Sequence, residues 1–166
     1  MVYPAKGFVN TDWGGDLVDR KSTSGYAFKV FCALISSASS KQKSVALSST
    51  EAEFMGLSDG SRKLVWLRKF LTDLKIPLTA PTPIYEDNQG AIALVENPIW
   101  HKRSKHIDIW YHYTRDVCAQ GELKLIYIPT QDQIADIFTK PLSRFQFEKL
   151  RTQLGVVSTY SSQVDT

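Results

Sequence analysis

The sequence predicts a mixed α/β domain in which one five-stranded sheet carries helices on both faces. Three observations lead to this fold class. Three strand-like runs lie within the first 41 residues and favour an antiparallel meander. A long helical pattern then extends from residue 48 to residue 74. From residue 84 onward, short strand-like and helical runs alternate, as expected for further strands of the same sheet.

The length and hydrophobicity of the chain fit one folded domain. The chain has 166 residues, of which 43% are hydrophobic, so it can bury a sizeable core. We expect residues 1–155 to form this domain. Residues 156–166 are rich in Ser and Thr and are expected to form a disordered tail.

Composition also restricts the environment and the partners of the chain. The two cysteines, Cys32 and Cys118, lack a metal-binding spacing and indicate a reducing compartment. No apolar run approaches the length of a transmembrane helix, and no signal peptide is visible, so no membrane partner is expected. The net charge of +3 permits a nucleic-acid partner without requiring one.

Three strands are expected before the long helix. The first runs from residue 1 to Val9, after a few untethered residues, and a polar loop at residues 14–24 follows it. Residues 25–34 alternate between two faces and contain one charge, Lys29, so both faces should be largely covered. Residues 35–41 would complete the antiparallel meander.

Hydroxyl side chains supply two possible N-caps for the long helix. Ser48 with Glu51, or Thr50 with Glu53, would form a capping box, and glutamates suit the positive end of the helix dipole. If Ser48 is the cap, Glu53 is free for another role. The helical pattern continues towards Pro77, which stops it.

The remaining elements follow in short succession. A proline-rich linker at residues 79–83 leads into the fourth strand. The strands expected in this half of the chain are at residues 84–86 and 123–128. The helices expected there are at residues 88–96, from 107 to near 121, 131–138 and 144–154.

Three carboxylates, Glu53, Asp87 and Asp136, lie at a strand-to-helix junction or near a helix start. At such positions side chains can converge over the end of a sheet, and converging carboxylates repel one another unless cations hold them. Each residue alone has an ordinary interpretation, as a helix cap or as a surface residue. Among such cations, Mg²⁺ prefers oxygen ligands and keeps several waters.

Five segments of the chain, taken in order, closely resemble the ribonuclease H domain of copia-type retrotransposon polyproteins. They are residues 12–26, 46–55, 84–92, 101–109 and 128–142. The resemblance covers about residues 7–155 and implies the ribonuclease H-like fold. It also implies cleavage of the RNA strand of RNA–DNA hybrids with two Mg²⁺ or Mn²⁺ ions. Such ions must sit ~3.5–4 Å apart to activate water and stabilise the leaving oxygen.

The resemblance implies metal ligands at Glu53, Asp87 and Asp136, and it reveals one departure. Family members have Asp where this chain has Asn10, whose neutral amide keeps an oxygen but loses the negative charge. We therefore expect weaker binding of at least one cation. Asp12 could substitute only with a backbone shift, because residues i and i+2 of a strand lie ~6.6 Å apart.

Nucleic-acid contacts are expected from a basic run and from polar side chains in a turn or at a helix start. The basic residues are Lys102, Arg103 and Lys105. They can grip phosphates, with an exposed charged loop as the alternative interpretation. The polar residues are Ser22, Thr23, Asn88 and Gln89. They could donate to a nucleic-acid backbone, with turn and cap roles as the alternative.

Two hypotheses of different class follow. The first is an active ribonuclease H domain with an RNA–DNA hybrid as substrate and an upstream reverse transcriptase domain as a partner. The second is a catalytically silent remnant, in which Asn10 has removed the activity and hybrid binding or protein interaction remains. The chain would be a polyprotein fragment or a stand-alone product. It would work inside the cell, in a cytoplasmic particle or in the nucleus.

Overall fold

The computed structural model describes residues 4–76, 78–97 and 108–157, and its centre is one five-stranded sheet with the strand order β3-β2-β1-β4-β5. The strands are β1 (Ala5–Asp12), β2 (Thr23–Val30), β3 (Ala33–Lys41), β4 (Thr82–Glu86) and β5 (Leu123–Tyr127). The first three strands are antiparallel neighbours, whereas β4 runs parallel to both β1 and β5. The mixed five-stranded sheet predicted from the sequence is confirmed.

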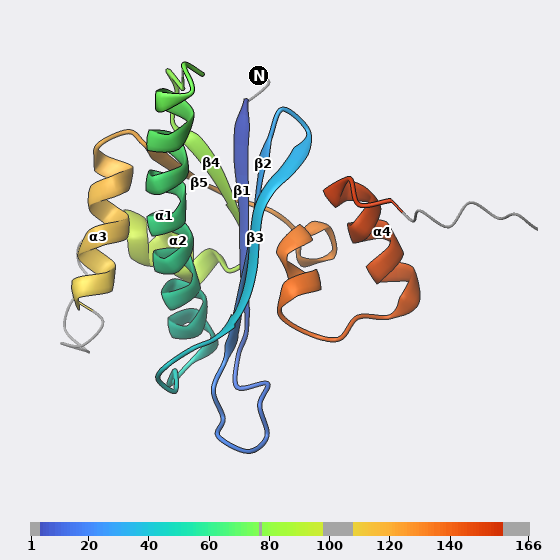
Figure 1. Cartoon of the computed structure of the whole chain (residues 1–166). Helices are drawn as coiled ribbons and strands as arrows, with labels where there is room; N and C mark the ends of the chain where they lie inside the picture. The colour runs from blue at the N-terminus through green and yellow to red at the C-terminus, as the bar shows by residue number, and fades with distance from the viewer. Residues whose placement is uncertain (1–3, 77, 98–107, 158–166) are drawn as a thin grey trace, which may run out of the picture.

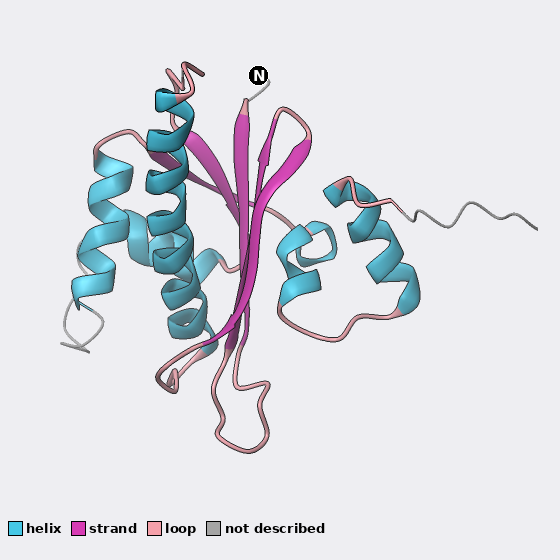
Figure 2. Cartoon of the chain, in the orientation of Figure 1, coloured by secondary structure: helices cyan, strands magenta, loops and turns pink. Residues whose placement is uncertain are grey.

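Helices cover both faces of this sheet, as the sequence predicted (Figures 1 and 2). One face carries α1 (Ser49–Asp73), α2 (Gln89–Glu96) and α3 (Asp108–Ala119). The other face carries the 3₁₀ helix η3 (Ile134–Phe138) and α4 (Arg144–Leu154). Among the described residues, none of the helices has the length and apolar character needed to cross a membrane.

The sheet separates two hydrophobic clusters because neighbouring strand residues point to opposite faces. The larger cluster lies between the sheet and α1, where Val9 and Ile84 of the sheet pack near Leu57 of the helix. The smaller cluster lies under η3 and α4, where Phe8 packs with Leu154. This alternation decides which side chains of β1 and β4 face α1.

The turn between β2 and β3 corrects the predicted strand boundary. The strand expected at residues 25–34 ends at Val30, and Phe31 and Cys32 form the turn with φ angles of 51° and 153°. The Phe31 N–H donates to the carbonyl of Pro4 at 2.7 Å, which closes the turn over the start of β1. Alternating apolar residues cannot reveal such a turn, because the pattern continues across it. Lys29 is buried as expected, and its ammonium donates to the carbonyl of Gln153.

Two other strand boundaries differ from the sequence prediction. β1 continues three residues past Val9 to Asp12, so Asn10 lies within the strand. β4 begins at Thr82, and therefore Pro83 belongs to the strand instead of the linker. The bounds of both strands are set by their pairing with neighbouring strands, which local sequence does not show.

The helix expected at residues 131–138 is replaced by two short 3₁₀ helices, η2 (Thr130–Asp132) and η3. Gln133 separates them and is fully buried. Its side-chain amide donates to the carbonyls of Val9 at 2.9 Å and Tyr85 at 3.2 Å. Because these bonds tie the segment to β1 and β4, it cannot form one continuous helix.

Candidate metal centre

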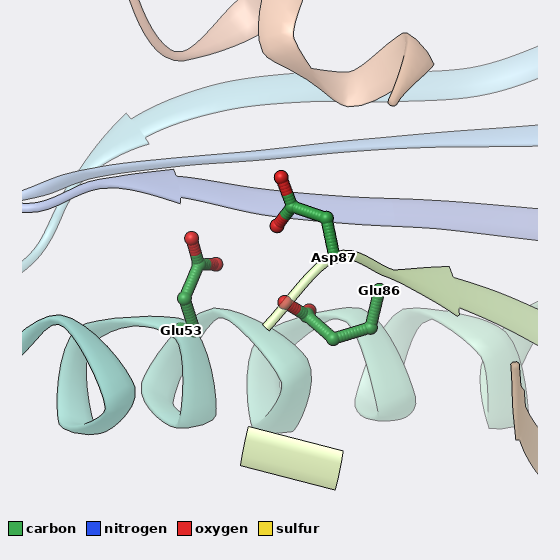
Figure 3. A group of neighbouring side chains, drawn as sticks. All are labelled: Glu53, Glu86 and Asp87. Atoms are coloured by element: carbon green, nitrogen blue, oxygen red, sulfur yellow. The ribbon is translucent and has the colours of Figure 1, made fainter. Parts of the chain in front are cut away.

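Glu53 reaches the centre from the second turn of α1. The side chain of Ser48 accepts the N–H of Glu51 at 3.1 Å and caps the helix, so Glu53 is not needed as a cap. Of the two caps that the sequence allowed, Ser48 is the one formed. Glu53 is 6% exposed and points away from the helix axis towards the sheet (Figure 3).

Two glycines bring this part of α1 close to β1. A Cβ atom at Gly56 would lie 2.5 Å from the hydroxyl of Thr11, and one at Gly60 would lie 2.6 Å from Val9 Cγ2. Real Cβ atoms do not approach neighbours this closely, so the helix packs here only because both positions lack a side chain. The close packing places Glu53 over the ends of β1 and β4.

Glu86 and Asp87 reach the same place from the end of β4. Ile84 packs on the α1 face, and Glu86, two residues later, shares that face. Asp87 leaves the strand in another direction (Figure 3). The chain then enters α2 through Asn88, whose side chain accepts the N–H of Ala91 at 3.0 Å. Asn88 is therefore the cap, which leaves Asp87 outside that role.

The three carboxylates form one compact group. Glu53, Glu86 and Asp87 each offer an oxygen that lies within 4.8 Å of those of the other two. Glu86 is fully buried, and its Oε1 accepts the N–H of Asn88 at 2.9 Å. Within the described part of the chain, Oε2 of Glu53 and Oε2 of Glu86 are buried without a hydrogen-bond partner. Such orphaned oxygens fit a divalent cation, which prefers carboxylate ligands.

The electrostatics of the group point in the same direction. Burial, followed by the charges of Glu86 and Asp87, raises the pKa of Glu53 to about 10, and a hydrogen bond from Thr11 opposes them. Burial also raises the pKa of Glu86 well above its ordinary value, against the opposing N–H of Asn88. Without a cation, Glu53 and Glu86 therefore tend to keep their protons. A bound cation would replace those protons.

Asp136 and Asn10 form a neighbouring pair. The Asn10 amide donates to Oδ1 of Asp136, and the ammonium of Lys140 lies 3.0 Å from Oδ2. Burial raises the pKa of Asp136, Lys140 opposes this, and the charges of Asp87 and Asp12 raise it further. The predicted ligand Asp136 thus lies close enough to Asp87 to feel its charge. It is not one of the three residues whose oxygens converge, and both of its oxygens have partners.

The other sequence-predicted residues lie outside the three-carboxylate group. Asp12 is partly exposed, and its carboxylate lies against Gly15 in the loop after β1. Ser22 is fully buried and accepts the N–H of Gly14 at 3.1 Å, so its side chain holds the loop. Thr23 begins β2 opposite Asp12, and Gln89 is exposed at the start of α2.

The basic run that was expected to contact phosphates lies outside the part of the chain that the structure describes. Lys102, Arg103 and Lys105 lie outside the described residues. Their expected contact with phosphates therefore stays a prediction from the sequence.

Glu86 was not among the site residues predicted from the sequence. A signal was available, because an acidic residue in phase with Ile84 at the end of an apolar strand is placed on a buried face. A buried Glu without a partner is uncommon unless a cation or a proton compensates it. The convergence of Glu86 with Glu53 itself depends on the packing of α1 and could not be obtained from spacing.

Comparisons with known proteins agree with this fold. No protein-family model matches the chain. Over 149 residues it is 44% identical to the retrovirus-related Pol polyprotein from transposon RE1 of Arabidopsis thaliana. That match covers 90% of this chain and 10% of the relative, so the chain spans about a tenth of the relative's length.

Two solved structures share the architecture. LC11 ribonuclease H1 in complex with an RNA/DNA hybrid aligns with a TM-score of 0.59 at 10% identity, covering 81% of this chain and 93% of that chain. The foamy viral protease–reverse transcriptase in complex with an RNA/DNA hybrid aligns with a TM-score of 0.59 at 16% identity, covering 82% of this chain and 19% of that chain. The ribonuclease H-like fold that the sequence resemblance implied is confirmed.

Proposed function

The chain belongs to the retrovirus-related Pol polyproteins of copia-type retrotransposons, as their ribonuclease H domain, and from this premise we propose that it binds RNA–DNA hybrids and cuts the RNA strand. The observation that carries the proposal is the convergence of Glu53, Glu86 and Asp87 at the end of β4. Buried carboxylates with an unpartnered oxygen oppose folding, so their presence argues for a ligand that compensates them. The two solved structures with hybrids support a hybrid as the substrate class.

Mg²⁺ or Mn²⁺ held at this centre would activate a water molecule and stabilise the oxygen that leaves the cleaved phosphodiester. Glu53 and Asp87 are the residues proposed to hold the cation, with Asp136 beside them. A hydrogen bond from the Thr11 hydroxyl lowers the pKa of Glu53, which favours its charged form. The buried position of Glu53 keeps bulk water away from its carboxylate and strengthens its interaction with charge.

Because of Asn10, we expect the cleavage activity of the chain to be low. Its amide donates to Asp136, and Lys140 neutralises the same carboxylate. The side of the centre formed by β1 and η3 therefore offers little uncompensated negative charge for a second cation. Cleavage in Mg²⁺ should be absent or very slow, and Mn²⁺ should recover part of it because it binds such ligands more strongly.

The same observation favours a second function of another class. If one cation is insufficient for cleavage, the chain binds hybrids without cutting them and is a catalytically silent remnant. The Asn10 amide gives this alternative its support, because it makes Asp136 a hydrogen-bonded structural residue.

A cleavage assay with labelled RNA–DNA hybrid separates these functions. We expect the natural chain to be slow in Mg²⁺ and Asn10→Asp to be at least tenfold faster, because the substitution restores a negative charge. Asp87→Asn should abolish cleavage in either background. Asp12→Asn is the matched control at the same end of β1 and should change little.

Two results would overturn the proposal or part of it. If a folded Asn10→Asp variant binds hybrid but does not cut it, the result would favour the second function, a catalytically silent remnant that binds hybrids. Rapid cleavage by the natural chain that Asp12→Asn abolishes would make Asp12 the ligand in place of Asn10.

Partners beyond the hybrid belong to the same proposal. The match with 10% of a Pol polyprotein, and with a viral protease–reverse transcriptase, supports an upstream reverse transcriptase domain as a neighbour. The domain would comprise residues 1–155, with Lys102, Arg103 and Lys105 as additional phosphate contacts. Such a domain would act inside the cell, in a cytoplasmic particle or in the nucleus.

A further inference from the structure

Glu86 is a buried carboxylate that the proposed ligand set does not use. It is 0% exposed, and its Oε1 accepts the N–H of Asn88 at 2.9 Å. Among the residues that the structure describes, no hydrogen-bond donor reaches its Oε2. A Gln at this position would accept the same N–H without a buried charge, so the structural role alone does not require a Glu.

The distribution of charge around the centre is uneven. Asp136 is paired with Lys140 and hydrogen bonded to Asn10, so its charge is largely compensated. Among the described residues, no salt bridge involves Glu53, Glu86 or Asp87, although an oxygen of each lies within 4.8 Å of the others. The demand for positive charge is therefore greatest between α1 and the end of β4.

We propose that this chain carries a single divalent-cation site formed by Glu53, Glu86 and Asp87, in which Glu86 is a metal ligand that replaces the missing carboxylate at Asn10. The inference rests on the proposed function, because it assumes that this group of carboxylates binds divalent cations. The inferred ligand set differs from that of the proposed function, because Glu86 is a ligand, whereas Asp136 and Lys140 form a structural ion pair beside the cation. Three carboxylate oxygens with remaining positions for water suit Mg²⁺ or Mn²⁺.

Titration with Mn²⁺ alone, followed by electron paramagnetic resonance and calorimetry, tests the ligand set without requiring catalysis. We expect the natural chain to bind one Mn²⁺ and Glu86→Gln to weaken binding at least tenfold. Asp136→Asn should stay within about threefold of the natural chain, because Lys140 already compensates the charge of Asp136. Glu96→Gln removes an exposed carboxylate at the end of α2 and is the matched control, which should leave binding unchanged.

The opposite pattern would overturn the inference. If Asp136→Asn weakens Mn²⁺ binding tenfold and Glu86→Gln leaves it unchanged, the cation is held by the set proposed from the sequence. Absence of Mn²⁺ binding by the natural chain would overturn it as well. Should Glu86→Gln fail to fold, Glu86→Asp keeps the charge but withdraws it by one methylene, and weaker binding is again expected.

Cleavage assays on the same variants separate this inference from the proposed function. If neither the natural chain nor Asn10→Asp cuts hybrids while Mn²⁺ binding still depends on Glu86, the proposed cleavage fails and the cation site stands. If hybrids are cut while Glu86→Gln binds Mn²⁺ as the natural chain does, the cleavage stands and the role of Glu86 fails.

Discussion

Replacing Asn10 by Asp should destabilise the metal-free protein and make its stability depend strongly on divalent cations. Asn10 is 2% exposed and donates to Asp136, which is 3% exposed. The substitution removes this donor and places a second carboxylate against the first. We expect the free energy of unfolding in EDTA to fall by about 2–4 kcal/mol, from the lost hydrogen bond and the repulsion that Lys140 only partly offsets.

Cations should reverse this loss because they bind the folded state. A cation present at 100 times its dissociation constant adds about 2.7 kcal/mol to the free energy of unfolding. Urea unfolding in EDTA and in Mn²⁺ measures both effects, and Asn10→Ala is the control that removes the hydrogen bond without adding charge. The reasoning is refuted if Asn10→Asp is as stable in EDTA as Asn10→Ala and gains no more from Mn²⁺.

Three further predictions concern the groups that position the centre. Burial raises the pKa of Glu53 from 4.5 to about 10, so its contribution to stability is present below pH 4.5 and is lost as pH rises towards 10. Urea unfolding in EDTA between pH 6 and pH 9 should show this decline, and Glu53→Gln should flatten it; an unchanged slope contradicts the assignment. Gly56→Ala would bring a methyl group within 2.5 Å of the Thr11 hydroxyl. It should lower stability by about 1–2 kcal/mol, because overpacking exceeds the gain in helix propensity, whereas a higher melting temperature argues against close packing of α1. Gln133→Ala should cost about 2 kcal/mol or more in urea unfolding by leaving two main-chain carbonyls without its amide, and a loss below 0.5 kcal/mol would show that water replaces it.

The sequence contained enough information for the order of elements and for two of the three converging carboxylates. The alternation of β2 and the cap at Ser48 are local properties, so a pattern can report them. The turn at Phe31 and the 3₁₀ helices around Gln133 depend on bonds to Pro4, Val9 and Tyr85, which are distant in the chain. Local periodicity carries no information on such bonds.

The residues of the centre likewise divide into those that local sequence predicts and those that depend on distant contacts. Glu53 and Asp87 were found because each stands near a helix start, whereas Glu86 stands inside an apolar strand. The pairing of Asp136 with Lys140 spans the end of η3, where the Lys140 N–H also donates to the carbonyl of Asp136 at 3.3 Å. Asn10 was identified from the sequence. Its side-chain hydrogen bond to Asp136, however, depends on how β1 lies against the segment after β5, and the sequence does not show this.

The most direct test of the account is to locate the cation. Crystals grown in Mn²⁺ and measured near the manganese absorption edge would give an anomalous difference map of the centre. The account predicts one strong peak in contact with the carboxylates of Glu53, Glu86 and Asp87. A second strong peak should appear beside Asp136 only in the Asn10→Asp variant. Absence of a peak at the first position in the natural chain, or a peak held by Asp136 without Glu86, would contradict the account.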